Sequence, residues 1–328
     1  MHPLKLRIII LMLLVFMTQG FAAHAQMIPA PLSLAASPSS PSPGAVVTVQ
    51  AATPTFDKDR AFFAWTVDGK ARPDFSGTGK NEIKLTAGDI GSQIRVSVGV
   101  SPSEGDGGDA SLIIRVSGLS LTYVAQTLIP RWYRGKALPT TNSIVDIIAI
   151  PEFVINGTRV APENLIYHWS MDDQTNALTG AGKQVFQIRT SDLPGTSHQV
   201  DVTVEDTDRK IHKEGRIIIE PEDPRVVIYP STPLGGIESR SANGTALQKR
   251  GLVDAAAEAF YFPTTSRQDL AWSWDLGGTP VYPSAGPALA TIDTSSLQQG
   301  TTPLTLRVSY AKGLIPQSAS KILNLFLP

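Results

Sequence analysis

Phe62-Phe63-Ala64-Trp65-Thr66-Val67 has two near copies further along the chain, Tyr167-His168-Trp169-Ser170-Met171 and Trp272-Ser273-Trp274-Asp275-Leu276. The central tryptophans, Trp65, Trp169 and Trp274, follow one another at intervals of 104 and 105 residues. A period of about 100 residues is too long for a solenoid repeat and matches the size of one β-sandwich domain. The spacing therefore predicts an all-β chain of three similar sandwiches in series, each with one of these tryptophans in its core.

Alternating apolar residues flank each tryptophan segment and predict strands with one buried face. Val200, Val202 and Val204, for example, share a face between polar neighbours. A period of two is typical of half-buried antiparallel sheets. Helix signals are scarce. We interpret the Ala-rich stretch 253–259 as a strand, with a helix as the alternative.

A proline supplies a second landmark in each repeat. Pro54, Pro151 and Pro263 are each predicted to end an early strand, and the tryptophan follows. The interval is seven residues longer in the middle repeat, which predicts an insertion around Asn156-Gly157-Thr158.

The predicted boundaries follow from these landmarks. Residues 1–25 form a signal peptide and 26–44 a tether rich in Pro and Ser. The three domains are predicted at 45–117, 118–222 and 223–328, with residue 31 as an alternative start of the first strand. The long polar segment 231–250 is interpreted as a loop that is either functional or disordered.

The N-terminus has the features of an export signal. Lys5 and Arg7 precede the apolar run 8–17, and Ala23-His24-Ala25 matches a cleavage site. An uncleaved anchor is the alternative, but the strongly apolar run is shorter than the roughly 20 residues that a membrane span needs. We expect the mature chain to be exported to the periplasm, the cell surface or the medium, with no membrane span of its own.

Composition restricts the chemistry. The formal net charge is −1 and 17% of the residues are charged, which argues against a nucleic-acid-binding surface. The chain has no cysteine, which excludes disulfides, thiolate chemistry and an N-terminal lipid on cysteine.

The tryptophan segments resemble tandem immunoglobulin-like modules of bacterial surface proteins, in particular the polycystic-kidney-disease (PKD) type. Those modules carry a Trp-Asp-Phe-Gly-Asp-Gly motif, and the nearest copy here is Trp274-Asp275-Leu276-Gly277-Gly278. The middle repeat also resembles a pattern of exported bacterial proteins of unknown role, through 133–139 and Ala149-Ile150-Pro151. The resemblance implies a sandwich fold and no particular activity.

No pattern predicts catalysis. The mature chain has three histidines, His168, His198 and His212, and we interpret them as surface residues on strands. None has the spacing to a partner that a metal site or a general base needs. No serine-hydrolase elbow or phosphate loop is present. We therefore expect a protein that is not an enzyme and has no cofactor.

Calcium is the one ion that the sequence suggests. Asp106, Asp109, Asp206 and Asp208 lie in acidic clusters of predicted loops, and oxygen ligands in such loops bind Ca²⁺ in some tandem domains. The spacing matches no complete site, and Asp/Gly runs are also common in hairpin turns.

Arg131, Trp132, Tyr133 and Arg134 form the candidate contact surface. Aromatic and Arg side chains carry much of the energy of protein interfaces. The alternative is that this stretch packs on its own domain or on the neighbouring one.

These features predict an exported interaction and spacer protein of the cell surface or envelope, as in an adhesive, pilus or secretion assembly. Its expected partner is an envelope or surface protein. The alternative is a carbohydrate-binding accessory protein whose partner is a glycan.

Overall fold

The computed structural model describes residues 32–327 except 54–55, 105–106, 173, 233, 235, 239, 243–244, 248–250, 284–285 and 314. The signal peptide, Pro54 and Asp106 lie outside the described residues. Two short 3-10 turns, η1 (Pro162–Asn164) and η2 (Arg267–Asp269), are the helical elements of this part of the chain, and its other regular elements are strands. The all-β prediction is confirmed. Neither turn has the length and apolarity to cross a membrane.

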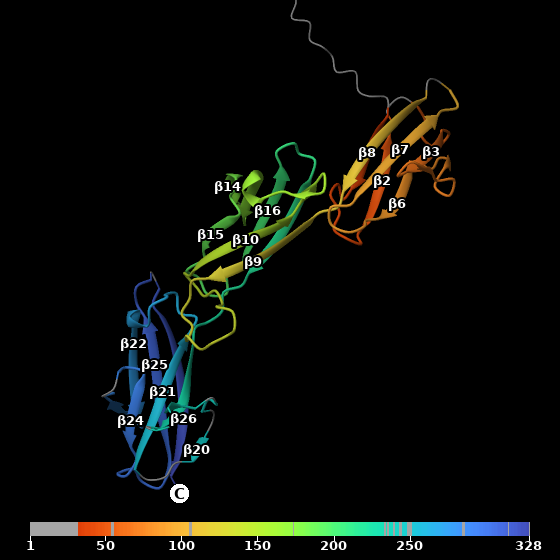
Figure 1. Ribbon diagram of the computed structural model, residues 1–328. Coiled ribbons are helices and arrows are strands. Elements are labelled where there is room, and N and C mark those ends of the chain that lie inside the picture. The colour runs from red at the N-terminus through yellow and green to blue at the C-terminus, as the bar shows by residue number, and fades with distance from the viewer. Residues whose placement is uncertain are drawn as a thin grey trace, which may run out of the picture. The chain divides into compact units, whose positions relative to one another are not determined.

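The strands fall into three groups along the chain (Figure 1). The first group is β1 (Ser33–Ser37), β2 (Val46–Ala52), β3 (Phe62–Val67), β4 (Lys70–Ala71), β5 (Gly77–Thr78), β6 (Glu82–Thr86), β7 (Gln93–Ser101) and β8 (Gly108–Arg115). The second is β9 (Gly118–Ala125), β10 (Ile144–Glu152), β11 (Val154–Ile155), β12 (Thr158–Arg159), β13 (Leu165–Met171), β14 (Gln174–Ala181), β15 (Val185–Arg189), β16 (His198–Asp206) and β17 (His212–Ile219). The third is β18 (Arg225–Thr232), β19 (Gly236–Ile237), β20 (Thr245–Leu247), β21 (Leu252–Phe260), β22 (Leu270–Leu276), β23 (Thr279–Val281), β24 (Leu289–Asp293), β25 (Gly300–Tyr310) and β26 (Gln317–Leu327).

The same sheet order recurs in all three groups. One sheet holds β1-β2-β6, β9-β10-β15 or β18-β21-β24, and the other holds β4-β3-β7-β8, β14-β13-β16-β17 or β23-β22-β25-β26. The tryptophan strand lies inside the second sheet each time. This is the strand arrangement of an immunoglobulin sandwich, in which a buried Trp sits on the third main strand. The prediction of three tandem immunoglobulin-like sandwiches is confirmed.

The tryptophans occupy equivalent buried positions. Trp65, Trp169 and Trp274 are at most 3% exposed. Each indole Nε1 donates to a backbone carbonyl, at 2.8 Å to Lys80, 2.7 Å to Lys183 and 3.0 Å to Pro287. A buried indole needs such an acceptor because its N–H has left water. The repeated sequence segment therefore encodes a repeated core contact.

The cores of the second and third groups lie between their two sheets. In the second, Val145 and Ile147 of β10 face Tyr167 and Trp169 of β13 across the core. In the third, the small residues of β21, such as Ala257, leave room for the larger Trp274. The stretch 253–259 is part of β21, so its interpretation as a strand is confirmed.

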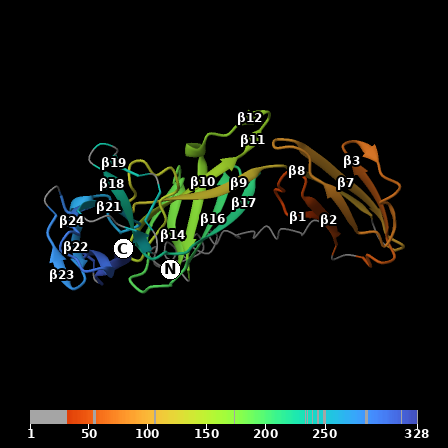
Figure 2. The same ribbon diagram turned by 90° about the horizontal axis from the view of Figure 1, so that it is seen from below.

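The middle insertion forms a hairpin. Strands β11 and β12 pair through a two-residue turn at Asn156 and Gly157, with φ of 52° and 78°. Two positive φ values are the geometry that Asn-Gly favours in a hairpin turn. Figure 2 shows this hairpin at one end of β10, which lies beside β9 in both views.

Pro151 lies at the end of its strand to within one residue, as predicted. It pairs with Leu119 of β9, and β10 ends at the next residue, Glu152. The other neighbour, β15, pairs with β10 only from Ile144 to Ile148. The missing N–H of Pro151 therefore faces an edge without a strand, where proline is tolerated.

Two predicted irregular segments contain strands. Residues 33–37 of the tether form β1, which pairs with β2, so the first strand starts close to the alternative position at residue 31. Within 231–250, β19 pairs with β18, and β20 pairs in parallel with β26.

The chain divides into two compact units. One takes in residues up to Ala35 together with Val49–Ile83 and Val96–Leu112, and the other comprises Ala36–Thr48, Lys84–Arg95 and Ile113–Pro328. This division does not test the predicted boundaries at 45, 118 and 223, which remain predictions. The candidate site described next lies wholly within 113–328.

Candidate functional site

The predicted contact residues lie on the connector, defined as residues 126–143 between β9 and β10. Both its ends are fixed to the second sandwich, because Gln126 donates its backbone N–H to Ile144 at 2.8 Å. Its middle contacts the third sandwich. Leu128 donates to the carbonyl of Phe262 at 3.0 Å and accepts the N–H of Tyr261 at 2.6 Å. Backbone hydrogen bonds therefore attach the connector to both sandwiches, through Gln126 to β10 of the second and through Leu128 to residues 261–262 of the third.

An aromatic cluster anchors the connector on β18 and β21. The ring of Trp132 meets Tyr229 and Phe260 edge to face, with centroids 5.9 and 6.3 Å apart. Tyr133 meets Phe260 in the same way at 5.3 Å. Such edge-to-face pairs are favoured by the quadrupoles of the rings. One side of Trp132 therefore packs on the neighbouring domain, which was the alternative to a contact surface, while 53% of its surface stays exposed.

Tyr261 bonds to two residues of the connector, Leu128 and Tyr133. Its φ is +63°, a left-handed conformation that is unusual for a bulky residue. A hydrogen bond of 3.0 Å joins its hydroxyl to that of Tyr133. Burial, and then the hydrogen bond to Tyr133, raise the pKa of Tyr261 to about 12. The strained backbone is kept in place by the N–H bond to Leu128 and by this hydroxyl pair.

The end of the candidate stretch requires a glycine. A Cβ atom on Gly135 would lie 2.3 Å from the Tyr133 ring, so any other residue would displace that ring. Next to it, the Lys136 ammonium lies 3.2 Å from the centroid of the Tyr123 ring, and desolvation lowers the pKa of this lysine. Arg134 is exposed and does not line the pocket described below.

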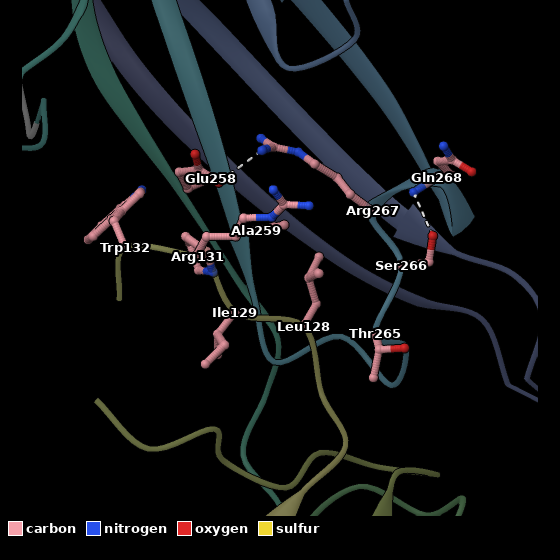
Figure 3. A pocket seen from close by; sticks show the side chains of 11 residues that line it. Leu128, Ile129, Arg131, Trp132, Glu258, Ala259, Thr265, Ser266, Arg267 and Gln268 are labelled. Carbon is pink, nitrogen blue, oxygen red and sulfur yellow. Dashed lines mark hydrogen bonds and ion pairs between the residues drawn. The ribbon is translucent and has the colours of Figure 1, made fainter. Parts of the chain in front are cut away.

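A pocket of about 640 Å³ opens beside the connector (Figure 3). Leu128, Arg131 and Trp132 line it from the connector, Glu258 and Ala259 from β21, and residues 265–268 from the loop around η2. Figure 3 shows the connector residues and the loop residues on different sides, with Glu258 and Ala259 between them.

The pocket lining carries two positive side chains, Arg131 and Arg267, and one negative side chain, Glu258. Glu258 is 7% exposed, and its carboxylate pairs with the Arg267 guanidinium at 3.1 Å. Arg267 also donates to the carbonyl of Ala257 and lies 5.0 Å from the Trp272 ring. Arg131 has no ion-pair partner in the described part of the chain and is exposed. One positive charge is therefore available to a ligand.

This arrangement provides groups for recognition. An aromatic face, a free guanidinium and a compensated carboxylate can orient a polar ligand. The pocket lining contains no histidine, and its Ser266 hydroxyl accepts the backbone N–H of Gln268 at 3.3 Å.

The interpretation of His198 as a surface residue is wrong. His198 is 6% exposed at the start of β16, with Nδ1 2.9 Å from the Asp172 carboxylate and Nε2 accepting the Ser191 N–H at 2.8 Å. His198 lies on the same inward face of β16 as Val200, so the alternating pattern of this strand already indicated that its side chain is buried. Asp172 also accepts the N–H of Gln199. These hydrogen bonds join the turn after β13 to the start of β16 and to Ser191. His168 is partly exposed and His212 is exposed.

The calcium candidates are dispersed. Asp206 is buried and accepts the N–H of Ile211 at 2.6 Å, and Asp208 pairs with Lys210 at 2.5 Å. Asp109 is exposed in β8. Among the residues that the structure describes, no group of three acidic or histidine side chains converges for a metal. The absence of a bound cofactor, with calcium as the alternative, remains a prediction.

Sequence reasoning missed the partners of the connector. Glu258, Arg267 and Tyr261 are far from 131–134 in the chain, and only the aromatic run 260–262 gave a signal of unusual packing.

No protein-family model and no curated protein matches the chain. Solved structures that the chain matches include the three N-terminal domains of the Highly Immunogenic Outer Capsid protein of bacteriophage RB49, with 9% identity, 90% of this chain and 98% of that chain covered, and a TM-score of 0.25. SGBP-B of the Bacteroides ovatus mixed-linkage glucan utilization locus, in complex with a mixed-linkage heptasaccharide, has 10% identity, coverage of 87% and 64%, and a TM-score of 0.22. The central fibronectin-III array of RIM-binding protein has 13% identity, coverage of 86% and 92%, and a TM-score of 0.30. At these TM-scores the matches carry no conclusion about function, and the fold assignment rests on the strand pairing described above.

Proposed function

We propose that this chain is an exported, non-enzymatic protein of a bacterial cell surface or envelope. Its immunoglobulin-like domains act as a spacer and present the connector to another envelope protein, as in an adhesive, pilus or secretion assembly. The signal peptide predicted at the N-terminus supports export, and the fixation of Trp132 beside a free guanidinium supports a contact role.

The observation that carries the proposal is the state of Trp132. One side of its ring is fixed on rigid strands by Tyr229 and Phe260, while 53% of its surface faces outward. A pre-positioned aromatic residue loses little entropy on binding, and Trp and Arg are the residue types that dominate interface energies.

The hydrogen bonds of His198 support the proposal that the chain is not an enzyme. Both ring nitrogens of His198 are engaged in bonds that hold a turn, so no proton acceptor of this residue is directed at a pocket. A general base needs an accessible nitrogen within reach of its substrate.

The experiment is cross-linking of intact producing cells, capture of the tagged chain and mass spectrometry of what accompanies it. Wild type is compared with Arg131→Glu and with Arg134→Glu, an exposed arginine of the same connector that is not in the pocket. We expect one envelope protein that is captured by wild type and by Arg134→Glu and is reduced with Arg131→Glu. Capture of the chain alone, with most of it free in the medium, would contradict the proposal.

A carbohydrate-binding accessory protein is the second candidate. The exposed ring of Trp132, next to the polar pocket, is the observation that favours it, since aromatic faces stack on sugars. A glycan array probed with wild type and with Trp132→Ala tests this function. Binding to one oligosaccharide class that Trp132→Ala abolishes would support it.

A further inference from the structure

Strand β15 leaves one edge of the second sandwich open. It lies at the end of the sheet β9-β10-β15, next to β10 and away from β9 (Figure 1). It pairs with β10 over its whole length, from Val185 to Arg189, and β10 is the only strand that pairs with it in the described part of the chain. The far side of β15, called here the open edge, therefore has no ladder partner.

The hydrogen bonds to β10 show which backbone groups face the open edge. Thr190, directly after the strand, donates its backbone N–H to the carbonyl of Ser143 at 2.9 Å. The direction alternates from residue to residue, so the even-numbered residues of β15 bond to β10. The odd-numbered residues therefore direct their N–H and C=O groups to the open edge, and these are Val185, Gln187 and Arg189.

These three residues are exposed and their backbone groups have no partner. Val185 is 46% exposed, and Gln187 and Arg189 are also exposed. No bond from their N–H or C=O groups occurs among the residues that the structure describes. Two of the side chains are held toward β10 and the connector, because Gln187 donates to the Asp146 carboxylate at 2.7 Å and Arg189 to the Asn142 side chain at 3.1 Å. The edge thus offers a row of free donors and acceptors.

The other strands at the edges of the second sandwich are irregular or covered. In β14, Asn176 has a φ of 55°, and the register with β13 shifts between Trp169 and Met171. Irregularities of this kind interrupt pairing with a further strand. Strands β9 and β17 lie against each other, since a Cβ atom on Gly215 of β17 would lie 3.1 Å from the Leu119 side chain of β9. The open edge is therefore where an added strand can pair regularly.

Arg189 gives the open edge a positive charge. Its guanidinium bonds to the neutral amide of Asn142, and none of the described carboxylates forms an ion pair with it. An added strand with Asp or Glu opposite Arg189 gains a charge-assisted cross-strand pair. A second copy of β15 has no acidic residue to offer, since its sequence is Val-Phe-Gln-Ile-Arg. The charge therefore favours an acidic segment of another protein over self-association.

We propose that the open edge of β15 binds an extended acidic segment of the envelope partner as an added antiparallel strand. The segment exchanges hydrogen bonds with the backbone groups of Val185, Gln187 and Arg189 that face the edge, and its Asp or Glu side chain pairs with Arg189. Addition of a strand to an exposed sheet edge is a common mode of peptide recognition. This inference rests on the proposed function, because it gives the partner a second contact besides the connector.

The alternation of β15 predicts the sequence of the segment. Phe186 and Ile188 are 8% and 5% exposed and face the core, so segment residues beside them have apolar side chains. Segment residues opposite Val185, Gln187 and Arg189 stay on the outer face of the sheet. From its N-terminus, the antiparallel segment therefore reads acidic, apolar, polar, apolar, β-branched, with the last residue opposite Val185.

The test pans a phage-displayed library of linear heptapeptides against the mature chain, and the selected peptides are synthesised for binding measurements. Gln187→Pro removes one N–H of the open edge, where proline is tolerated, and Gln187→Ala removes the same side chain but keeps the N–H. Arg189→Glu is an exposed substitution that keeps the fold even where Gln187→Pro does not, and Arg134→Glu is its matched control. Circular dichroism of each variant reports folding.

We expect acidic peptides with alternating apolar residues to be enriched. Their affinity should fall about tenfold in Arg189→Glu and about fivefold in Gln187→Pro, and stay unchanged in Arg134→Glu and Gln187→Ala. Failure to enrich acidic peptides, or equal binding by Arg189→Glu and Arg134→Glu, would overturn the inference.

Amide exchange in the wild type locates the bound peptide. A selected peptide should slow exchange most at Val185, Gln187 and Arg189, whose N–H groups face the open edge. The N–H groups of Phe186 and Ile188 already bond to β10 and should change less. Slowing that is equal at odd-numbered and even-numbered residues, or confined to another strand, would also overturn the inference.

The proposed function and the open edge fail separately. If intact cells yield an envelope partner while no peptide protects the amides of β15, the proposed function stands and the strand site falls. If acidic peptides bind the edge while cells yield the chain alone, the strand site stands and the proposed function falls. If the mature chain dimerises and the same amides become protected, the edge belongs to a second copy and the inference is overturned.

Discussion

Replacement of Trp132 by Ala measures how firmly the connector is held. The side chain is 53% exposed, so about half of the roughly 1.5–3 kcal/mol for full burial is at stake, or about 1 kcal/mol. The two edge-to-face contacts with Tyr229 and Phe260 add about 0.5–1.5 kcal/mol each. The free energy of local opening of the connector should therefore fall by at least about 2 kcal/mol, with each contact taken at the lower end of its range.

Amide hydrogen exchange reads this opening directly. The N–H groups of Leu128 and Tyr261 bond across the junction, to Phe262 and Leu128 respectively, and exchange only when the connector detaches. A loss of about 2 kcal/mol makes their exchange about 30-fold faster, at about 1.4 kcal/mol per tenfold. The measurement is residue-resolved exchange by NMR in wild type and in Trp132→Ala.

The control variant is Arg134→Ala, on the same connector but outside the pocket, which should leave both amides unchanged. The amide of Trp169, in the core of the second sandwich, should also keep its rate in Trp132→Ala. Unchanged exchange at Leu128 and Tyr261 would refute the packing described for Trp132. Loss of protection throughout the third sandwich would show instead that Trp132 is a core residue.

Three further outcomes are expected. Trp169→Phe should destabilise the second sandwich by about 2–4 kcal/mol, because it leaves the Lys183 carbonyl without its donor and opens a void. Urea unfolding, followed by exchange of the β13 amides, measures this loss. A loss under about 1 kcal/mol would contradict the core assignment. The pKa of Tyr261 is raised from 10.0 to about 12, so the unfolded chain loses this proton first. The contribution of Tyr261 to stability should therefore be constant below pH 10 and fall as pH rises from 10 to 12. Tyr133→Phe should weaken that fall in urea titrations, and an identical pH profile would argue against the hydroxyl pair. The melting temperature of the mature chain should not change on adding Ca²⁺, because Asp206 and Asp208 already bond to protein donors; a rise of several degrees would contradict this.

Much of the fold could be predicted from local patterns. The tryptophan spacing and the period of two depend on residues near one another in the chain, and they gave the three sandwiches and the strand at 253–259. The hairpin at Asn156 and Gly157 was located by a length difference alone. Pro151 lies one residue before the end of β10, as its landmark role predicted, but that β15 no longer pairs with β10 at this position is a property of the sheet that its neighbours in the sequence do not show.

The candidate site was only half predictable. Trp132 and Arg131 stand out by residue type, but their surroundings come from β18, β21 and the loop at η2, more than 90 residues later in the chain. His198 could have been placed in the core by its parity with Val200.

The central claim is that the connector meets an envelope protein. The most direct measurement is a photoreactive phenylalanine analogue in place of Arg131, activated in intact producing cells, with the same analogue in place of the exposed Thr175 of β14 as a control. We expect a cross-link to one envelope protein from position 131 and none from position 175. A cross-link from position 175 instead, or none from either position, would contradict the account.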